Sequence, residues 1–383
     1  DTMLRFVPLV LFLAACNGDF EFPETASDAV ATYSEIVSAS YEDSLSSAQD
    51  LDATLEAFVA APSDSGLTDA KDAWLDSREP YLQTEVYRFY DGPIDNPTDG
   101  PEGLLNAWPL DENHIDYVEG EDTAGIINDI TQTIDGVSLE SLNENGGEKN
   151  VATGYHAIEF LLWGQDFSDD GPGERPFTDF MTGEQGTAAN QDRRGQYLTV
   201  SGDLLVKHLS QLMDAWTVDA PYRTNFEADT EGSFENILTG MIILSGFETG
   251  GERLQAALDS GSQEDEHSCF SDNTHRDMIQ DIQGVENVWQ GSYTRVDGSV
   301  VSGTGIVDVV AELDQDLADR VTARIGESLS LANALETPFD LEIAPGSPGN
   351  ARVQALVDSL SAQEEVLTEV FLAFELAPDI PTE

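Results

Sequence analysis

The sequence predicts an all-α protein built from two helical-bundle domains of about four helices each. Three observations favour this fold class. Apolar residues recur at steps of three and four over most of the chain, which is the spacing of one helix face. The chain has 383 residues, enough for two domains of ordinary size. Only residues 296–301 resemble a strand, and we expect a loop there.

The first predicted bundle covers residues 26–188. Its longest helix is expected to begin at Ser27, a residue type that often caps helices, and to reach Ala61, where Pro62 follows. A single amphipathic helix of this length is typical of a bundle. Further helices are expected over residues 67–77, 81–90, 122–133 and 151–163.

The second predicted bundle covers residues 189–380. Residues 165–190 are rich in Gly, Pro, Asp and Thr and have no sustained period, so we place the domain boundary there. Beyond the boundary, helices are expected over residues 191–216, 234–259, 273–290, 307–334 and 349–376.

The net charge is extreme. The chain has 74 acidic and 16 basic residues, which gives a formal net charge of −58. Such a surface repels nucleic acid and anionic lipid headgroups, so neither is an expected partner. Hydrophobic residues still make up 40% of the chain, enough for a folded core. Self-repulsion on this scale fits a salt-adapted source.

The N-terminal residues 1–16 have the pattern of an exported bacterial lipoprotein. An apolar run over residues 6–13 is far shorter than the ~20 residues that span a bilayer. It ends in Leu-Ala-Ala-Cys, which resembles a lipobox with Cys16 as the lipidated residue. Residues 17–25 would then form a tether. The alternative is an ordinary secretory signal cut after Ala15. If Cys16 carries lipid, Cys269 is left alone and no internal disulfide can form.

A histidine and a glutamate lie three residues apart in "GYHAIEFLLWGQD". On a helix, His156 and Glu159 share one face, so both side chains can reach one metal ion. Zinc peptidases of the common kind have a second histidine four residues after the first, where this chain has Phe160. The alternative is a helix that packs into the core while His156 bonds to a neighbour.

A second cluster, "EDEHSCFSDNTHRD", gathers histidines, carboxylates and one thiol. His275 could supply a third ligand to a site shared between the domains. Ser271 or Asp272 could instead cap the helix that begins near Asn273, and capping is the interpretation we favour for Asp272. We expect Cys269 to be buried as a small apolar residue.

Two further stretches carry charges among apolar residues. Residues 84–95 include Glu85, Arg88 and Asp95, and residues 245–254 include Glu248 and Arg253. Charges in such surroundings are usually paired with each other. Phosphate loops, nucleophile elbows and dinucleotide fingerprints do not occur in the sequence.

Together these stretches resemble the imelysin-like family. Its Gly-x-His-x-x-Glu hallmark is present as Gly154, His156 and Glu159. The resemblance extends over "YRFYDGPID", "WPLDENHIDYVEG", "GFETGGERL" and "EHSCFSDNTHRDM", and so covers about residues 26–376. It implies two helical bundles anchored at the bacterial envelope, a link to iron uptake, and metal ligation by the histidine and the glutamate.

From the residues and the resemblance we expect an envelope lipoprotein that binds a metal ion, with iron favoured over zinc, or an iron-bearing ligand, for iron acquisition. The expected ligands are His156 and Glu159, completed by His275 and Glu85. The expected surrounding groups are Gly154, Arg88, Asp95, Glu248, Arg253 and Asp272. A metallopeptidase at the same site and a module for a non-metal ligand are the alternatives.

The expected location and partners follow from the N-terminus. Because Asn17 rather than aspartate follows Cys16, we expect the outer membrane, with the protein facing the periplasm. The membrane is contacted through the lipid anchor only, and components of iron transport are the expected protein partners.

Overall fold

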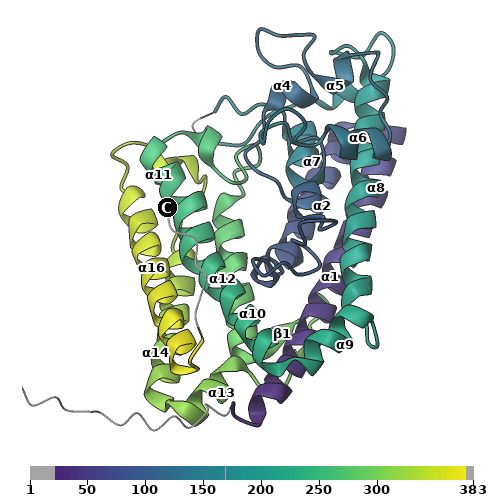
Figure 1. Ribbon diagram of the computed structural model, residues 1–383. Helices are drawn as coiled ribbons and strands as arrows, with labels where there is room; N and C mark the ends of the chain where they lie inside the picture. Colours follow the sequence, from purple (N-terminus) through teal and green to yellow (C-terminus); the bar gives the residue numbers. More distant parts are fainter. Residues whose placement is uncertain (1–21, 169, 377–383) are drawn as a thin grey trace, which may run out of the picture.

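The computed structural model describes residues 22–168 and 170–376 (Figure 1). Within them helices dominate, so the all-α prediction is confirmed. The longer helices are α1 (Thr25–Ala60), α2 (Asp64–Leu82), α7 (Gly154–Trp163), α8 (Gln191–Trp216), α9 (Pro221–Ala228), α10 (Thr230–Ile243), α12 (Thr274–Gln290), α13 (Ile306–Leu313), α14 (Gln315–Ala332) and α16 (Asn350–Ala373). Short helices are α3 (Glu102–Leu105), α4 (Glu112–Ile115), α5 (Gly125–Asn128), α6 (Gly136–Leu142), α11 (Ala256–Ser260) and α15 (Asp340–Ile343).

Three short segments of the described chain are 3₁₀ helices of three or four residues, namely η1 (Glu85–Tyr87), η2 (Phe177–Phe180) and η4 (Gln263–Asp265). The segment η3 (Leu244–Gln255) is a π-helix. Figure 1 shows α1, α2, α7 and α8 on the right and α11, α12, α14 and α16 on the left. The predicted signal peptide with Cys16 lies outside the described residues. Among residues 22–168 and 170–376, no helix is both long and apolar enough to cross a membrane.

The long helix α1 packs along α2 and α8. Its 36 residues correspond to roughly 54 Å at 1.5 Å per residue. The predicted cap is wrong. Ser27 lies inside the first turn, where its hydroxyl donates to the carbonyl of Glu24, and Glu24 occupies the N-cap position without a side-chain bond.

The helix α2 covers the helix predicted over residues 67–77 and continues to Leu82. Pro80 lies within it, two residues before the last residue, Leu82. A proline there removes one backbone hydrogen bond but leaves the rest of the last turn to continue. The chain then turns through η1, so the helix predicted over residues 81–90 is wrong. The helix predicted over residues 122–133 is reduced to α5.

In the second half the helix over residues 191–216 is confirmed at both ends as α8. Residues 307–334 divide into α13 and α14, because the side chain of Asp314 accepts a bond from the backbone of Leu317 and starts a new helix. The prediction of a loop over residues 296–301 is wrong in part. Strands β1 (Ser292–Thr294) and β2 (Val300–Ser302) pair as an antiparallel hairpin.

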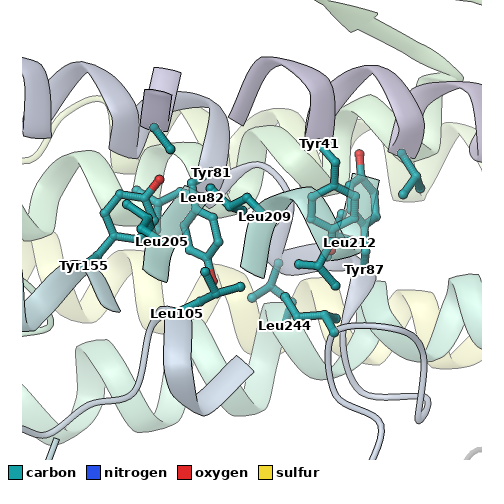
Figure 2. Packing of buried hydrophobic residues seen from close by; sticks show 14 of the residues in the cluster. Tyr41, Tyr81, Leu82, Tyr87, Leu105, Tyr155, Leu205, Leu209, Leu212 and Leu244 are labelled. Atoms are coloured by element: carbon teal, nitrogen blue, oxygen red, sulfur yellow. The ribbon is translucent and has the colours of Figure 1, made fainter. Parts of the chain in front are cut away.

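The core contains two clusters of buried apolar side chains. The larger cluster includes residues of α1, α2, α7, α8, α10, α13, α14 and α16. Figure 2 shows part of it, with Tyr41, Tyr81 and Tyr87 among leucines such as Leu205 and Leu209. The smaller cluster lies between η3, α11, α12, α14 and α16. The division into two domains near residue 188 stays a prediction.

Candidate metal centre

The helix α7 positions the His-x-x-Glu pair inside the molecule. All ten of its residues are buried. Its first residue, Gly154, has φ +85°, and a Cβ built there would lie 2.4 Å from the carbonyl oxygen of Leu105. A glycine is required at this position both by its backbone conformation and by the close approach of the neighbouring chain. Gly154 therefore allows the start of α7 to pack directly against the backbone of Leu105.

His156 and Glu159 form a hydrogen-bonded pair with no exposed surface. Nδ1 of His156 lies 2.8 Å from Oε2 of Glu159. The other oxygen, Oε1, accepts bonds from the backbone nitrogen of Ser271 at 3.0 Å and from its hydroxyl at 2.7 Å. Burial raises the pKa of Glu159 to about 8, against the opposing effect of Ser271. Burial, and then the charges of His267 and Arg78, lower the pKa of His156 well below its usual range. Burial thus disfavours both the ionised form of Glu159 and the charged form of His156.

A second histidine, His267, lies beside this pair. The rings of His156 and His267 lie edge to face, with centroids 4.8 Å apart. Nδ1 of His267 lies 2.8 Å from Oδ2 of Asp277, which also accepts a bond from the Ser268 hydroxyl at 2.5 Å. Nδ1 of His275 instead lies 3.3 Å from the carbonyl oxygen of Asp272, in the first turn of α12. The structure thus brings together two histidines that each share a hydrogen bond with a carboxylate.

Arg78 and Trp108 enclose the two imidazoles. Arg78, on α2, donates to Asn106 at 2.5 Å and pairs with Asp277 at 3.3 Å. Burial alone would raise the pKa of Asp277, but Arg78 and His267 hold it well below its usual range. The ring centroid of Trp108 lies 4.9 Å from that of His156. The guanidinium of Arg78 also lies over the rings of Trp74, Tyr81 and Tyr155.

A network of buried ion pairs adjoins the centre. Oε2 of Glu85 lies 2.6 Å from both Arg88 and Arg253. Arg253 further pairs with Glu248 at 2.9 Å and with Asp281 at 2.8 Å. Burial would raise the pKa of Glu85, yet the two arginines lower it to about 2. Glu85 and Arg88 of one stretch and Glu248 and Arg253 of another are therefore in contact. Each is paired with a residue of opposite charge, as expected for charges among apolar residues.

The π-helical segment η3 contributes three residues to this network. Glu248 and Arg253 lie on it, and Thr249 donates to Asp281 at 3.2 Å. Such widened turns are rare and occur frequently at functional sites. Burial raises the pKa of Asp281 to about 7 even though Arg253 opposes the shift.

Asp95 and Asp272 form no salt bridge among the described residues. Oδ2 of Asp95 accepts hydrogen bonds from the backbone nitrogens of Phe89 and Tyr90, so this side chain stabilises the turn between residues 89 and 95. Asp272 does not cap α12, because neither of its oxygens accepts a hydrogen bond and Asn273 takes the N-cap position. The capping prediction for Asp272 is wrong. Cys269 is buried as predicted, at 3% exposure.

Several residues of the centre were not predicted. These are His267, Asp277, Ser271, Arg78, Trp108 and Asp281. His267 and Asp277 stand in the quoted acidic stretch, and their i, i+10 spacing has no helical meaning because a turn separates them. Arg78 had one signal, since Trp74 and Tyr81 flank it on the same helix face. The centre offers two imidazoles, but among the described residues a set of three ligand atoms within 4.8 Å of one another occurs elsewhere, at Asp166, Asp272 and Asp340.

Known proteins show similarity over nearly the whole chain. A protein named iron-regulated protein A, from Synechococcus elongatus, is 26% identical over 337 residues, which are 87% of this chain and 82% of that protein. The crystal structure of a protein named as an iron-regulated protein A precursor, from Parabacteroides distasonis, matches with a TM-score of 0.71 at 19% identity. That match covers 94% of this chain and 97% of the other, and it shows the fold. The Imelysin family model matches residues 37–367, which include every residue of the centre. This chain therefore belongs to the imelysin family.

Proposed function

We propose that this protein binds a metal ion, with iron favoured over zinc, between the imidazoles of His156 and His267. The observation that carries the proposal is the state of the His156 ring. Its Nδ1 is tied to Glu159, while its Nε2 is fully buried and has no hydrogen-bond partner among the described residues. A buried imidazole nitrogen without a partner is unfavourable unless something binds it.

The hydrogen bonds of both histidines support metal ligation through the remaining nitrogen. A histidine that binds a metal commonly bonds through its other ring nitrogen to a carboxylate, which fixes the tautomer and the ring orientation. Glu159 and Asp277 occupy this position at Nδ1 of His156 and of His267, each at 2.8 Å. In this arrangement Glu159 orients His156, and the two Nε2 atoms are the candidate ligands.

Two imidazoles do not complete a coordination shell. Water, or oxygen atoms carried by an iron-bearing ligand, would fill the other positions. Imidazole suits zinc and iron alike, so the donor atoms do not select the metal. Iron is favoured because the relative from Synechococcus elongatus is named for iron regulation. Lipid anchoring at Cys16, a location at the outer membrane and a partnership with iron-transport components complete the proposal, and they depend on the predicted lipobox.

Peptide hydrolysis is the less favoured activity. His156 and Glu159 have no exposed surface, so a peptide bond could not reach them unless the surrounding helices separated. A metal ion needs far less space. We expect no cleavage of insulin or casein by the wild-type protein, with or without added zinc or iron.

The proposal is tested by metal content and by metal binding. The protein is purified without chelator and its metals are measured by mass spectrometry, and Fe²⁺ and Zn²⁺ binding is titrated calorimetrically without oxygen. His156→Ala and His267→Ala should abolish binding, and Glu159→Gln should weaken it by about 10-fold to 100-fold through loss of orientation. His275→Ala is the matched control and should bind as the wild type does.

Helical content measured by circular dichroism separates loss of a ligand from loss of the fold. Binding that depends on His275 rather than His267 would overturn the assignment of the ligands. Proteolysis that disappears in His156→Ala and Glu159→Gln would establish the peptidase. The absence of both binding and proteolysis would leave a non-metal ligand or a packing role for the pair.

A further inference from the structure

A separate acidic cluster joins three segments that are distant in the sequence. Asp166 follows α7, Asp272 lies in the turn before α12, and Asp340 begins α15. Each offers a carboxylate oxygen, and these atoms all lie within 4.8 Å of one another. All three residues are buried. Like charges that are buried this closely repel one another strongly unless something neutralises them.

Glu266 provides an independent observation at the same place. It has no exposed surface, and neither of its carboxylate oxygens accepts a hydrogen bond among the described residues. A fully buried carboxyl group therefore lies beside the acidic cluster, where the carboxyl groups of Asp340 and Asp272 and the hydroxyl group of Thr274 act on it.

Asp272 is in the same condition. It is 7% exposed, and both of its carboxylate oxygens are buried without a hydrogen-bond partner. No salt bridge within residues 22–168 and 170–376 involves Asp272 or Glu266. The carboxylates of the histidine centre differ, since Asp277 has both Arg78 and His267 as partners.

We propose that Asp166, Asp272 and Asp340, with Glu266 beside them, bind a hard divalent cation of the Ca²⁺ class. All the donors are carboxylate oxygens, which hard cations prefer and which differ from the imidazoles of the other centre. Ca²⁺ binds oxygen at about 2.3–2.6 Å, so it can bridge oxygens that lie up to about 5 Å apart. Backbone carbonyls and water would complete its shell.

The position suggests what the ion does. It would tie the segment after α7 and the start of α15 to the turn that carries Ser271, the residue that bonds to Glu159. Asp166 also lines a surface pocket of about 650 Å³ together with Lys71 and Asp170, so the cluster borders a solvent-filled space on one side. The cation would thus fix the turn that holds the histidine centre, although its binding does not require the proposed function to be correct.

Protons are the alternative means of neutralisation. Burial, and then the charges of Asp340 and Asp166, raise the pKa of Asp272 to about 7. Protonated carboxyl groups could therefore share hydrogen bonds in the absence of any ion. The two cases differ in one measurable property, because only a cation site gains stability from added Ca²⁺ in a saturable way.

The test is Ca²⁺ titration of the chelator-treated protein at pH 7.5 in 0.5 M NaCl, followed by calorimetry and thermal melting. The salt suppresses weak binding to the acidic surface. Asp272→Asn is the test variant, because asparagine has the same shape and tolerates the left-handed backbone at this position, φ 57°. Asp265→Asn is the matched control, since Asp265 is exposed and lies in the same segment.

We expect the wild type and Asp265→Asn to bind one Ca²⁺ and to melt at a higher temperature when it is bound. Asp272→Asn should bind at least about tenfold more weakly, because it loses a charged ligand. In chelator, Asp272→Asn should be no less stable than the wild type, which shows that it folds. Equal Ca²⁺ affinity of the two variants, or the absence of saturable binding to the wild type, would overturn the proposal.

His156→Ala separates this proposal from the function proposed above. This variant should lose the transition metal and keep the Ca²⁺ response. If iron binding fails in every variant while Ca²⁺ still binds through Asp272, the cation site stands alone.

Discussion

The buried carboxylate of Asp277 is compensated by neighbouring side chains. Asp277 accepts from Ser268 and contacts His267 and Arg78, and it has no exposed surface. Removing one member of such a pair leaves the other charge buried without compensation, which costs far more than the pair contributes. The arginine is therefore a structural requirement of the site although it contacts neither proposed metal ligand through an ion pair.

Replacing Arg78 by leucine should destabilise the protein strongly. The uncompensated charge of Asp277 is expected to lower the free energy of unfolding by about 3–5 kcal/mol. Urea denaturation followed by circular dichroism measures the change. Arg320→Leu is the control, because Arg320 forms an exposed pair with Glu369 and should change the stability little. Equal effects of the two substitutions would contradict the account.

The glycine of the hallmark has a backbone role that can be measured separately. Gly154 and Gly120 have nearly the same φ, +85° and +82°, but a Cβ at Gly120 would meet nothing within 4 Å. Alanine at either position carries the cost of the left-handed backbone, about 1–3 kcal/mol. Gly154→Ala adds the clash with Leu105 and should unfold at a clearly lower urea concentration than Gly120→Ala. Equal urea midpoints of the two variants would show that the backbone near Leu105 can move away from the added methyl group without loss of stability.

At the scale of elements, α1 packs against α8. Asp52, on α1, lies against Gly202 of α8, and burial followed by the charges of Asp203 and Glu56 raises its pKa from 3.8 to about 6. The folded state thus favours the protonated form. The contribution of Asp52 to the stability of the folded state is therefore fully present below about pH 4, where the group is protonated. It is lost as the pH rises through 6 and the buried carboxyl group ionises.

Asp52→Asn should therefore stabilise the protein in a pH-dependent way. The variant and the wild type should melt at similar temperatures at pH 4, and the variant should melt at a higher temperature at pH 8. Asp50→Asn removes one charge from the exposed face of the same helix and controls for the change in net charge. A difference at pH 8 that is no larger than that of the control would show that Asp52 is not desolvated.

The sequence predicted those elements whose boundaries depend on apolar spacing alone. The helix over residues 191–216 ends where its apolar stripe ends. Elements that depend on tertiary contacts were not predictable in this way. One example is Pro80, which lies inside α2 although proline usually ends a helix. Another is η3, whose π-helical turns contain more residues than α-helical turns, while the spacing of its apolar residues predicts an ordinary helix.

The candidate site shows the same limit. His156 with Glu159 and the two ion-pair stretches were identified from the sequence, but the choice between His267 and His275 depends on a turn. Asp272 has φ 57°, and the backbone of Asn273 donates to the carbonyl of Ser268. This reversal leaves His275 on α12 and directs His267 toward α7. No spacing rule contains that information.

The whole molecule combines an acidic total with arginines that are placed in part in its buried ion-pair networks. The chain carries 74 acidic and 16 basic residues, and several of its arginines are used in the buried networks described above. Apart from the buried acidic cluster, the excess negative charge lies on the surface, where the carboxylates repel one another over distances comparable to the Debye length.

Thermal stability should rise with ionic strength. Between about 0.01 and 0.15 M NaCl the Debye length falls from ~30 Å to ~8 Å, which screens the repulsion between surface carboxylates. Melting followed by circular dichroism in the presence of a chelator measures this effect without a contribution from divalent cations. A flat or falling curve would mean that local pairing already neutralises the field, and the salt-adapted interpretation would then be dropped.

The bond from Ser271 to Glu159 closes a loop of chain whose ends are 112 residues apart, and this separation has a consequence during synthesis. A ribosome that adds about 5–20 residues per second needs roughly 6–22 seconds to pass from one residue to the other. For that time α7, all of whose residues are buried in the finished fold, has no partner for the face that receives Ser271. A nascent chain at this stage displays one of the most apolar helices of the protein. Chaperone binding should therefore peak on chains that have completed residue 163 and not yet reached residue 271.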